Sequence, residues 1–396
     1  MMNRPTNILL AFDKFKGALT AEEACGIAAS SLGSLGRDDF SLVEAPLTDG
    51  GEGFCPILAE ANGGKIERIE VADPLWRSVR APIGWVESGR LPEAARKRIG
   101  AKPGEKVAVI EMASASGLLL LDESERDPWH TTTAGTGELI RHAVVSGADR
   151  IVLGVGGSAT NDCGAGVLEA LGVEFLAVDG QLITQVCPAR FDKVDRVDFS
   201  RAMELPPLII ASDVRSPLLG KSGATRVFGP QKGLKDVERM EDMFTQLSIK
   251  VSAASTRDPS ADDPGMGAAG GISFGLSSLA AVRIEPGFSL VSEWMGLEDK
   301  ISAADWVLTG EGRVDQGSLS GKGPISLVRE AAAQGVQTRI FAGALEAGVP
   351  ESLSAELGDS CKCIALSDPN WSLATALDMN RSRLEEEVIH WARAEL

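Results

Sequence analysis

The chain has 396 residues, of which 44% are hydrophobic, and a formal net charge of −17 without a basic run. This length favours two domains with a core in each, and the charge argues against nucleic acid or an anionic membrane surface as partners. No apolar run reaches the roughly 18 residues that cross a bilayer, the N-terminus lacks the pattern of a secretory signal, and the six cysteines lack disulfide or zinc spacing, so we expect a reduced, cytoplasmic protein.

Two units of strand, loop and helix open the chain. Residues 7–12 predict a buried strand, and Thr20 with Glu23 has the pattern of a capping box that begins a helix. Residues 41–45 predict a second strand, which is followed by a Gly-rich turn and a helix from about Glu52.

The rhythm changes between residues 65 and 112. The runs KIERIEV, VRAPIGWV and KVAVIEM predict successive strands with little helix between them, and residues 88–106 predict an exposed hairpin excursion. This change indicates a separate or inserted domain.

Alternation of strand and helix then resumes. We expect helices over 136–146 and from about 163, and strands near 150–155, 173–178 and 207–213. A parallel sheet is the simplest arrangement for this order.

The end of the chain resembles its beginning in character. From residue 302 onward the runs DWVLT, TRIFAG and CKCIAL predict three more strands, and residues 371–394 predict a closing helix. We therefore predict one domain built from residues 1–62 and 282–396, with residues 63–281 inserted as a second domain.

Gly-rich turns that carry acids or lysines follow most of the predicted strands. Such turns present backbone N–H groups and helix N-termini, which hold phosphate or carboxylate. Each acid alone also fits a helix or turn cap, but carboxylates, lysines and glycines together favour Mg²⁺-nucleotide phosphoryl transfer. The loop residues of this kind are Asp13, Lys16, Asp49, Asp213, Lys232, Glu311, Asp315 and Lys322.

Two other functions stay open at this point. Residues 153–159 (LGVGGSA) fit G-x-G-x-x-A after a strand, with Glu174 spaced for a ribose contact, as in an NAD-dependent dehydrogenase of a small hydroxy acid. The segment contains Ser158 and runs on into Thr160, Asn161 and Asp162, which suit phosphate and metal better. A non-enzymatic sensor of small acids is the other alternative, whereas the motifs of a P-loop and of a nucleophilic serine are absent.

Nine motifs follow one another along nearly the whole chain. They read DKFKGAL (13–19), PLTDGGEG (46–53), IEMASASGL (110–118), GTGELI (135–140), GVGGSATND (154–162), SDVRSPLLG (212–220), VFGPQKG (227–233), GAAGG (267–271) and TGEGRVD (309–315). This set resembles the bacterial glycerate kinase family, whose members carry D-S-F-K-G-S-L and P-x-A-D-G-G-E-G. The sequence departs from the family pattern at Cys163, where Gly is usual, and at Gln316, which is displaced within the usual D-x-Q-T.

The resemblance implies ATP-dependent phosphorylation of D-glycerate, with 2-phosphoglycerate favoured over 3-phosphoglycerate as the product. The implied fold is α/β, with a discontinuous Rossmann-like parallel-sheet domain and an inserted flavodoxin-like α/β domain. The implied cofactors are ATP and Mg²⁺, and the implied partner is the small-molecule substrate; the oligomeric state is left open.

Under this hypothesis the loop residues receive candidate roles. Asp213 is the candidate general base, Asp13 is the second choice, and Lys16 and Lys322 steady the transferring oxygens. Arg77 is a candidate partner for the glycerate carboxylate. The candidate Mg²⁺ contacts are Asp49, Asp162 and Asp315; the candidate nucleotide contacts are Gly156, Gly157, Ser158, Asn161, Gly267, Gly270, Gly271 and Glu311; and the candidate substrate contacts are Asp49, Arg77 and Ser116.

Overall fold

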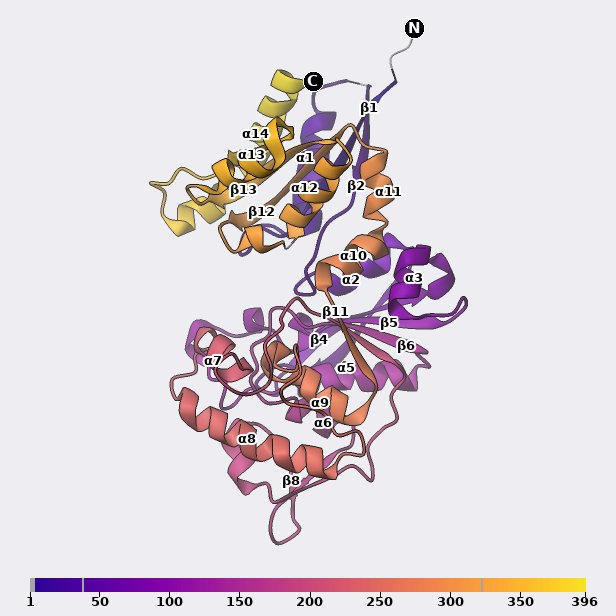
Figure 1. Cartoon of the computed structure of the whole chain (residues 1–396), viewed down its shortest axis with the longest axis vertical. Helices are drawn as coiled ribbons and strands as arrows, with labels where there is room; N and C mark the ends of the chain where they lie inside the picture. The colour runs from indigo at the N-terminus through magenta and orange to yellow at the C-terminus, as the bar shows by residue number, and fades with distance from the viewer. Residues whose placement is uncertain (1–3, 38, 322) are drawn as a thin grey trace. The chain divides into compact units, whose positions relative to one another are not determined.

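The computed structural model describes residues 4–37, 39–321 and 323–396 (Figure 1). The chain divides into two units, residues 1–48 with 291–396, here the terminal unit, and residues 49–290, here the middle unit. The first boundary between the units follows residue 48, where the sequence analysis expected residue 62. The second follows residue 290, where it expected residue 281. Each unit has its own sheets and cores. In the described part of the chain no helix is long and apolar enough to cross a membrane.

The terminal unit is built on a five-stranded parallel sheet. In spatial order its strands are β14 (Cys361–Ala365), β13 (Gln337–Leu345), β12 (Trp306–Val314), β1 (Thr6–Phe12) and β2 (Phe40–Glu44). Strands from both ends of the sequence therefore share one sheet, as expected, because β1 pairs with β12 from Ile8 opposite Trp306 to Phe12 opposite Gly310.

The strand order of this sheet contains a reversal. Counted along the chain within the unit, the order is 2-1-3-4-5, which is the doubly wound, flavodoxin-like order. The sequence analysis assigned the flavodoxin-like pattern to the inserted part, and the structure has it in the terminal unit instead. Strand order depends on pairing between distant segments, which local patterns do not record. The reversal lies between β1 and β12, where sheets of this class bind ligands at the carboxyl ends of the strands.

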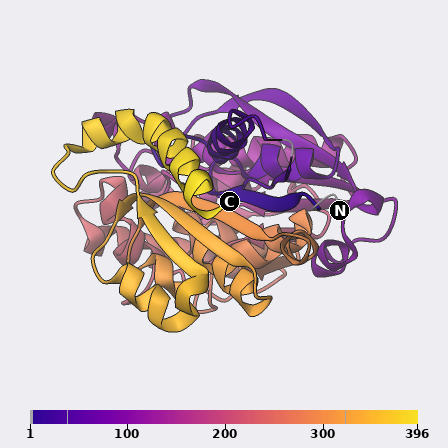
Figure 2. The ribbon, with the colours of Figure 1, turned by 90° about the horizontal axis from the view of Figure 1, so that it is seen from above.

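Helices cover both faces of the terminal sheet. Alternate residues of β13 point into two different cores, with Phe341 in one and Ile340 and Ala342 in the other. The first core packs beneath α1 (Ala21–Gly33) and α14 (Leu373–Glu395), which lie side by side in Figure 2. The second core packs beneath α12 (Gly323–Ala333) and α13 (Val349–Leu357). The predicted capping box is present, because Thr20 Oγ1 accepts from the Glu23 amide at 3.1 Å and Glu23 Oε2 accepts from the Thr20 amide at 2.9 Å.

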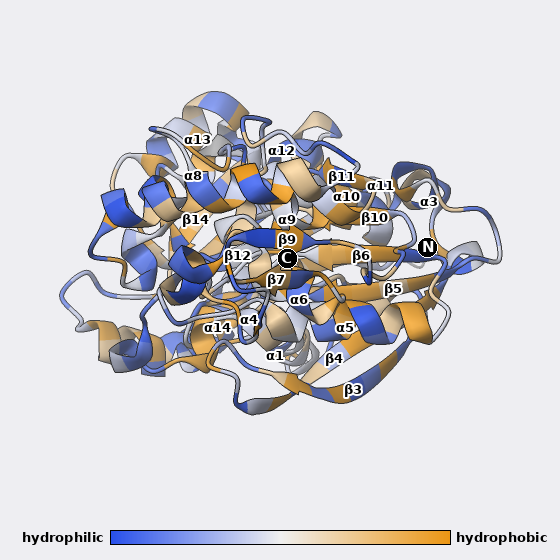
Figure 3. Cartoon of the chain, turned by 90° about the horizontal axis from the view of Figure 1, so that it is seen from below, coloured by the Kyte–Doolittle hydropathy of each residue, from blue (hydrophilic) through white to orange (hydrophobic). Residues whose placement is uncertain are grey.

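The middle unit is built on a six-stranded mixed sheet. In spatial order its strands are β11 (Val282–Glu285), β10 (Leu208–Ala211), β6 (Arg150–Gly154), β5 (Lys106–Glu111), β4 (Ser78–Glu87) and β3 (Lys65–Ala72). The first four are parallel, and β4 runs antiparallel to its neighbours β5 and β3. The central strands β5 and β6 are apolar in their middle parts (Figure 3), which agrees with burial on both faces.

One face of this sheet forms the main core of the unit with α5 (Ala134–Val145) and α9 (Ile272–Leu279). The helix α2 (Phe54–Ala61) packs against β4 and β5. The remaining helices of the chain are α3 (Glu93–Ile99), α4 (Ala113–Ser116), α6 (Ala165–Ala170), α7 (Ala224–Phe228), α8 (Val237–Ala254), α10 (Gly287–Met295) and α11 (Leu297–Ser302). Short 3₁₀ turns are η1 (Ser88–Arg90), η2 (Leu118–Leu120), η3 (Glu123–Glu125), η4 (Pro188–Lys193), η5 (Pro230–Lys232), η6 (Ala268–Gly270), η7 (Ser318–Ser320) and η8 (Gly358–Ser360).

Two local predictions were wrong. Residues 174–176 were expected in a parallel sheet, but they form β7 (Glu174–Leu176) of a small antiparallel sheet with β8 (Leu182–Ile183) and β9 (Arg196–Asp198). The excursion at 88–106 is not uniformly exposed, because it contains α3, whose residues Ala95 and Ile99 are buried. At residues 174–176, local antiparallel pairing decided the structure, although the apolar run predicted a strand of the main sheet. At residues 88–106, packing of α3 decided it, although the polar composition predicted an exposed hairpin.

Candidate functional site

The candidate site of the middle unit lies at the carboxyl edge of its sheet. The parallel strands β5, β6 and β10 end there, and the loops that follow them carry most of the predicted residues. The loop after β6 touches the Gly50–Gly51 turn, since the Gly156 amide donates to the Gly50 carbonyl at 2.9 Å. A Cβ atom at Gly156 would lie 2.8 Å from the Gly51 Cα, so the absence of a side chain allows this approach.

Asp49 and Asp213 converge on Gly287, the first residue of α10. The Gly287 amide donates to Asp213 Oδ1 at 3.0 Å. A Cβ atom at Gly287 would lie 2.7 Å from the Asp49 carbonyl oxygen and 3.2 Å from Asp213 Oδ2. Both acids are half-buried. The structure therefore places the carboxylate of the predicted base Asp213 and the backbone of Asp49, which stand more than 160 residues apart in the sequence, beside the same glycine.

Asp162 is a structural carboxylate. It is fully buried and accepts four hydrogen bonds, from the Thr133 amide and hydroxyl at 2.8 Å each, from Gly164 N at 3.1 Å and from Gly166 N at 3.2 Å. Burial raises the pKa of the Asp162 carboxyl, and these four hydrogen bonds oppose the rise. The predicted Mg²⁺ role of Asp162 does not fit this geometry, because both oxygens are occupied inside the core.

The glycines of residues 267–271 also have a packing role. The amides of Gly267, Gly270 and Gly271 donate to backbone carbonyls at 3.0, 3.2 and 3.1 Å, so they are not directed at a ligand. A Cβ atom at Gly270, whose φ is +76°, would lie 2.3 Å from the Thr160 carbonyl oxygen. The prediction of a phosphate cradle therefore rests on Gly157, which is exposed, and Ser158, which is half-buried.

Two predicted substrate contacts are engaged elsewhere. Ser116 is fully buried, with its Oγ 2.8 Å from Thr136 Oγ1. Arg77 Nε donates to Asp73 at 2.5 Å, and its guanidinium also donates to Glu125 at 2.7 Å. The pKa of Arg77 is raised by these two carboxylates. Both side chains therefore already have partners within the protein.

The sequence analysis placed Lys232 among the loop lysines but gave it no individual role, and the structure shows that its side chain is buried. Lys232 is 3% exposed, and its Nζ donates to Ser158 Oγ at 2.8 Å and to the Thr160 carbonyl at 2.6 Å. Burial lowers the pKa of the Lys232 amine to about 7, against the attraction of the Asp162 carboxylate. Asn161 lies beside this group, and its Nδ2 donates to Thr225 Oγ1 at 3.2 Å. The signal in the sequence was a lysine inside the Gly-rich motif VFGPQKG.

The candidate site of the terminal unit lies at the switch between β1 and β12. Asp13 directly follows β1, is 7% exposed, and its Oδ1 accepts from the Lys14 amide at 2.7 Å. The backbone of the exposed residue Lys16 lies close to β12, since a Cβ atom at Gly312 would be 2.9 Å from the Lys16 backbone nitrogen. Asp315 directly follows β12 and accepts from Arg313 Nε at 3.1 Å.

The remaining predicted residues of this unit fall differently. Glu311 was expected in a loop, but it lies within β12, because that strand continues to Val314. Lys322 lies outside the described residues. The structure thus brings Asp13 and Lys16 together with the end of β12 at the point where the strand order reverses.

No ready-made metal cage exists in residues 4–37, 39–321 and 323–396, where no three His, Cys, Asp or Glu side chains form a group that could hold an ion. A Mg²⁺ ion that enters with nucleotide phosphates can be held by a single protein carboxylate, so Asp49 of the middle unit and Asp315 of the terminal unit are separate candidates.

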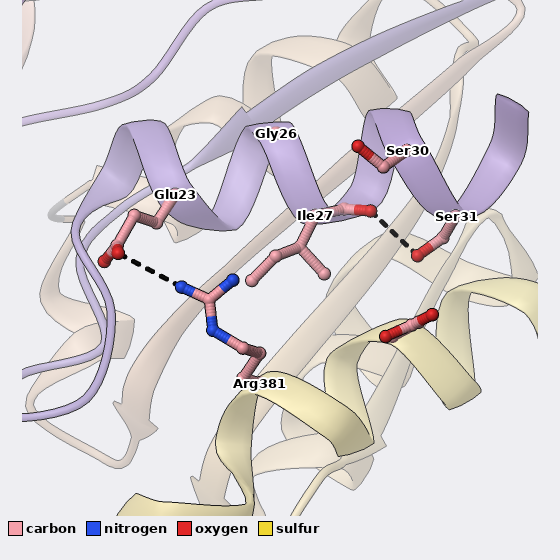
Figure 4. Close-up of a pocket in the computed structure, with 7 residues that line it drawn as sticks. Glu23, Gly26, Ile27, Ser30, Ser31 and Arg381 are labelled. Carbon is pink, nitrogen blue, oxygen red and sulfur yellow. Dashed lines mark hydrogen bonds and ion pairs between the residues drawn. The ribbon is translucent and has the colours of Figure 1, made fainter.

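Two surface hollows lie away from these edges. One, of about 420 Å³, lies between α1 and α14, where Arg381 points toward Glu23 at 3.1 Å (Figure 4). The other, of about 350 Å³, lies between β3 and α5. None of the predicted site residues lines either hollow.

Comparisons with known proteins match almost the whole chain. The model of the Glycerate kinase family matches residues 8–394. A glycerate kinase of Bacillus subtilis is 37% identical over 85% of both chains, and a glycerate 2-kinase of Escherichia coli is 35% identical over 82% of this chain and 81% of its own. The crystal structure of a putative glycerate kinase 2 from Salmonella typhimurium LT2 aligns with a TM-score of 0.76 and 32% identity, covering 99% of this chain and 98% of the other.

Proposed function

Because this chain belongs to the glycerate kinase family and is therefore a kinase, we propose that it transfers the γ-phosphoryl group of ATP to D-glycerate, giving 2-phosphoglycerate. The observation that carries the proposal is the family match over residues 8–394, which includes both carboxyl edges. The choice of the 2-hydroxyl is supported by the relative from Escherichia coli, which is named a glycerate 2-kinase.

Asp213 is the proposed general base. Its hydrogen bond from the Gly287 amide fixes the direction of the carboxylate at the carboxyl end of β10. A carboxylate in this position accepts the proton of the attacking hydroxyl as the new O–P bond forms and the bond to the ADP oxygen breaks. Asp13 is the alternative base, at the end of β1.

Charge neutralisation is assigned to lysines and to a bound cation. When bound, Mg²⁺ neutralises charge on the nucleotide phosphates, and we propose Asp49 of the middle unit or Asp315 of the terminal unit as its protein contact. Lys16 and Lys322 are proposed to stabilise the transferring oxygens. Gly157 and Ser158 are proposed to contact phosphate at the middle-unit edge.

The direct test is ADP formation by the purified protein with ATP, Mg²⁺ and D-glycerate, with phosphorus NMR to identify the product. We expect ADP formation that requires D-glycerate and stops in excess chelator, and a product with the phosphate on the 2-position. A 3-phosphate product would overturn the regiochemistry alone. Glycerate-dependent reduction of NAD without ADP formation would favour a dehydrogenase, and binding of glycerate without turnover would favour a sensor.

A further inference from the structure

The buried amine of Lys232 contacts the loop after β6, a contact that neither helix capping nor simple packing requires. It ends the 3₁₀ turn η5, and its side chain reaches the loop after β6, more than 70 residues earlier in the chain. A buried ammonium group is costly unless polar partners surround it. Lys232 has two such partners, and one of them, Ser158, is a half-buried residue at the candidate phosphate edge.

The turn that carries Lys232 is fixed by its own backbone. The Lys232 amide donates to the Gly229 carbonyl at 3.0 Å, and Gly233, whose φ is +97°, closes the turn. A second contact ties the same segment to the same loop, because Thr225 of α7 accepts from Asn161. The backbone of η5 and the Asn161–Thr225 contact therefore both help to fix the Lys232 amine relative to Ser158.

The chemistry of the contact gives the serine a direction. An ammonium group has three hydrogens and no lone pair, so it donates and never accepts. Ser158 Oγ is therefore the acceptor in its 2.8 Å contact with the charged form of Lys232. The hydroxyl hydrogen of Ser158 is left to point elsewhere, and the half-buried position of Ser158 makes the sheet edge available to it.

We infer that Lys232 is a positioning residue, which holds Ser158 so that its hydroxyl donates to an anionic oxygen of the nucleotide or of the glycerate carboxylate. This inference rests on the proposed function. An anionic ligand at Ser158 also favours the charged form of the amine behind it, because opposite charges attract strongly in a buried setting. Ser158 touches the ligand, and Lys232 acts through Ser158.

The test is a double-mutant cycle with Lys232→Met, Ser158→Ala and the double variant, using the full chain. Steady-state KM and kcat are measured for ATP and for D-glycerate, and calorimetry measures binding of each ligand alone. We expect each single variant to raise KM by about tenfold for one of the two ligands, as the loss of one hydrogen bond to a charged group does. We expect the double variant to be no weaker than Lys232→Met, because both changes remove the same contact.

A matched control is Lys250→Met in the same unit. Lys250 Nζ also donates to a backbone carbonyl, that of Val194, but it touches no serine of the site. We expect Lys250→Met to leave both KM values unchanged. If Lys232→Met does not fold, as judged by circular dichroism, Lys232→Gln takes its place in the cycle, because its amide keeps a donor for the Thr160 carbonyl.

The ligand whose KM and affinity change identifies the anionic group: a change for ATP indicates phosphate, and a change for D-glycerate indicates carboxylate. Unchanged affinity for both ligands in Ser158→Ala overturns the inference, and so does strict additivity in the double variant, which would make Lys232 a structural residue only. If the wild-type protein does not turn over glycerate, the proposed function fails, and the cycle is decided by the calorimetric affinity for ATP, which does not depend on turnover.

Discussion

The carboxyl edges of the two sheets use the same kinds of residues in different ways. At the middle-unit edge Asn161, Asp162 and Lys232 are at most 3% exposed, and their polar atoms mostly bond within the protein. At the terminal-unit edge Lys16 is exposed, and the Arg313–Asp315 pair faces solvent. The comparison teaches that Asn161, Asp162 and Lys232 build the loops of the middle-unit edge, whereas the exposed Lys16 is available to a ligand.

Asp213→Asn tests a residue of the middle-unit edge that is only half-buried and so differs from its buried neighbours Asn161, Asp162 and Lys232. If it is the base, turnover should fall by about 10³ while affinities for ATP and D-glycerate stay the same, because the amide keeps the shape but cannot accept the proton. Steady-state kinetics and calorimetry measure both quantities. Asp179→Asn, which alters another acid that accepts a backbone amide in this unit, should have no effect. Recovery of activity at high Mg²⁺ would reassign Asp213 to the metal.

Asp162→Ala should destabilise the middle unit by about 3 kcal/mol or more, because it leaves buried donors of Thr133, Gly164 and Gly166 without their acceptor. Urea unfolding measures the loss. Asp198→Ala is the control, since Asp198 also accepts a backbone amide but lies on a small outer strand, and its loss should be much smaller. A stable Asp162→Ala protein with a raised requirement for Mg²⁺ would restore the metal role.

Lys16→Ala, at the terminal-unit edge, should lower turnover strongly and stability very little, the reverse of Asp162→Ala. We expect turnover to fall by about 10², as when one electrostatic donor to the transferring group is lost, with stability changed by less than about 0.5 kcal/mol. Kinetics and urea unfolding give the two numbers. Lys362→Ala, which removes another surface lysine of this unit, should change neither. Normal turnover with a loss of stability would make Lys16 a structural residue.

Lys232 predicts a pH dependence of stability that is specific to the middle unit. Its folded pKa of about 7 lies below the usual 10.5, so the unfolded chain binds more protons between these values and stability rises with pH in that window. From pH 7 to 8.5 we expect a gain of about 1–2 kcal/mol, which Lys232→Met should remove. The facing charge is Asp162, whose carboxylate opposes the shift. Equal pH dependence in the two proteins, measured by urea unfolding, would show that Lys232 stays charged in the fold.

The features that the sequence predicted well are local ones. The capping box of Thr20 and Glu23 depends on residues three apart, and the strands that became β1, β3, β4 and β12 depend on short apolar runs. The α/β class and the sheet shared by both ends of the chain followed from the alternation of these elements. Which unit carries the 2-1-3-4-5 order did not follow, because pairing such as that of β1 with β12 is non-local.

The positions of the candidate residues along the fold could be predicted from the sequence, but their burial and contacts could not. Motif spacing placed Asp49, Asp213 and Ser158 at strand ends, where the structure has them. It could not show that Asp162 is fully buried or that the Gly270 amide is already bonded, because those facts depend on what packs against each loop. Lys232 was visible as a lysine in a motif, but its contact with Ser158 spans 74 residues.

The central position of β1 in the terminal sheet sets an order of events during synthesis. One neighbour of β1, the strand β2, leaves the ribosome soon afterwards, but the other neighbour, β12, begins at Trp306. At roughly 5–20 residues per second, about 14–54 seconds separate the completion of β2 from that of β12. Residues 49–290 are complete before β12 is made, so the middle unit can fold while β1 and β2 wait with an unpaired edge. Slow translation before residue 306 should therefore favour association of nascent chains through that edge, whereas a permuted chain that begins after β11 would make the whole terminal sheet in one stretch.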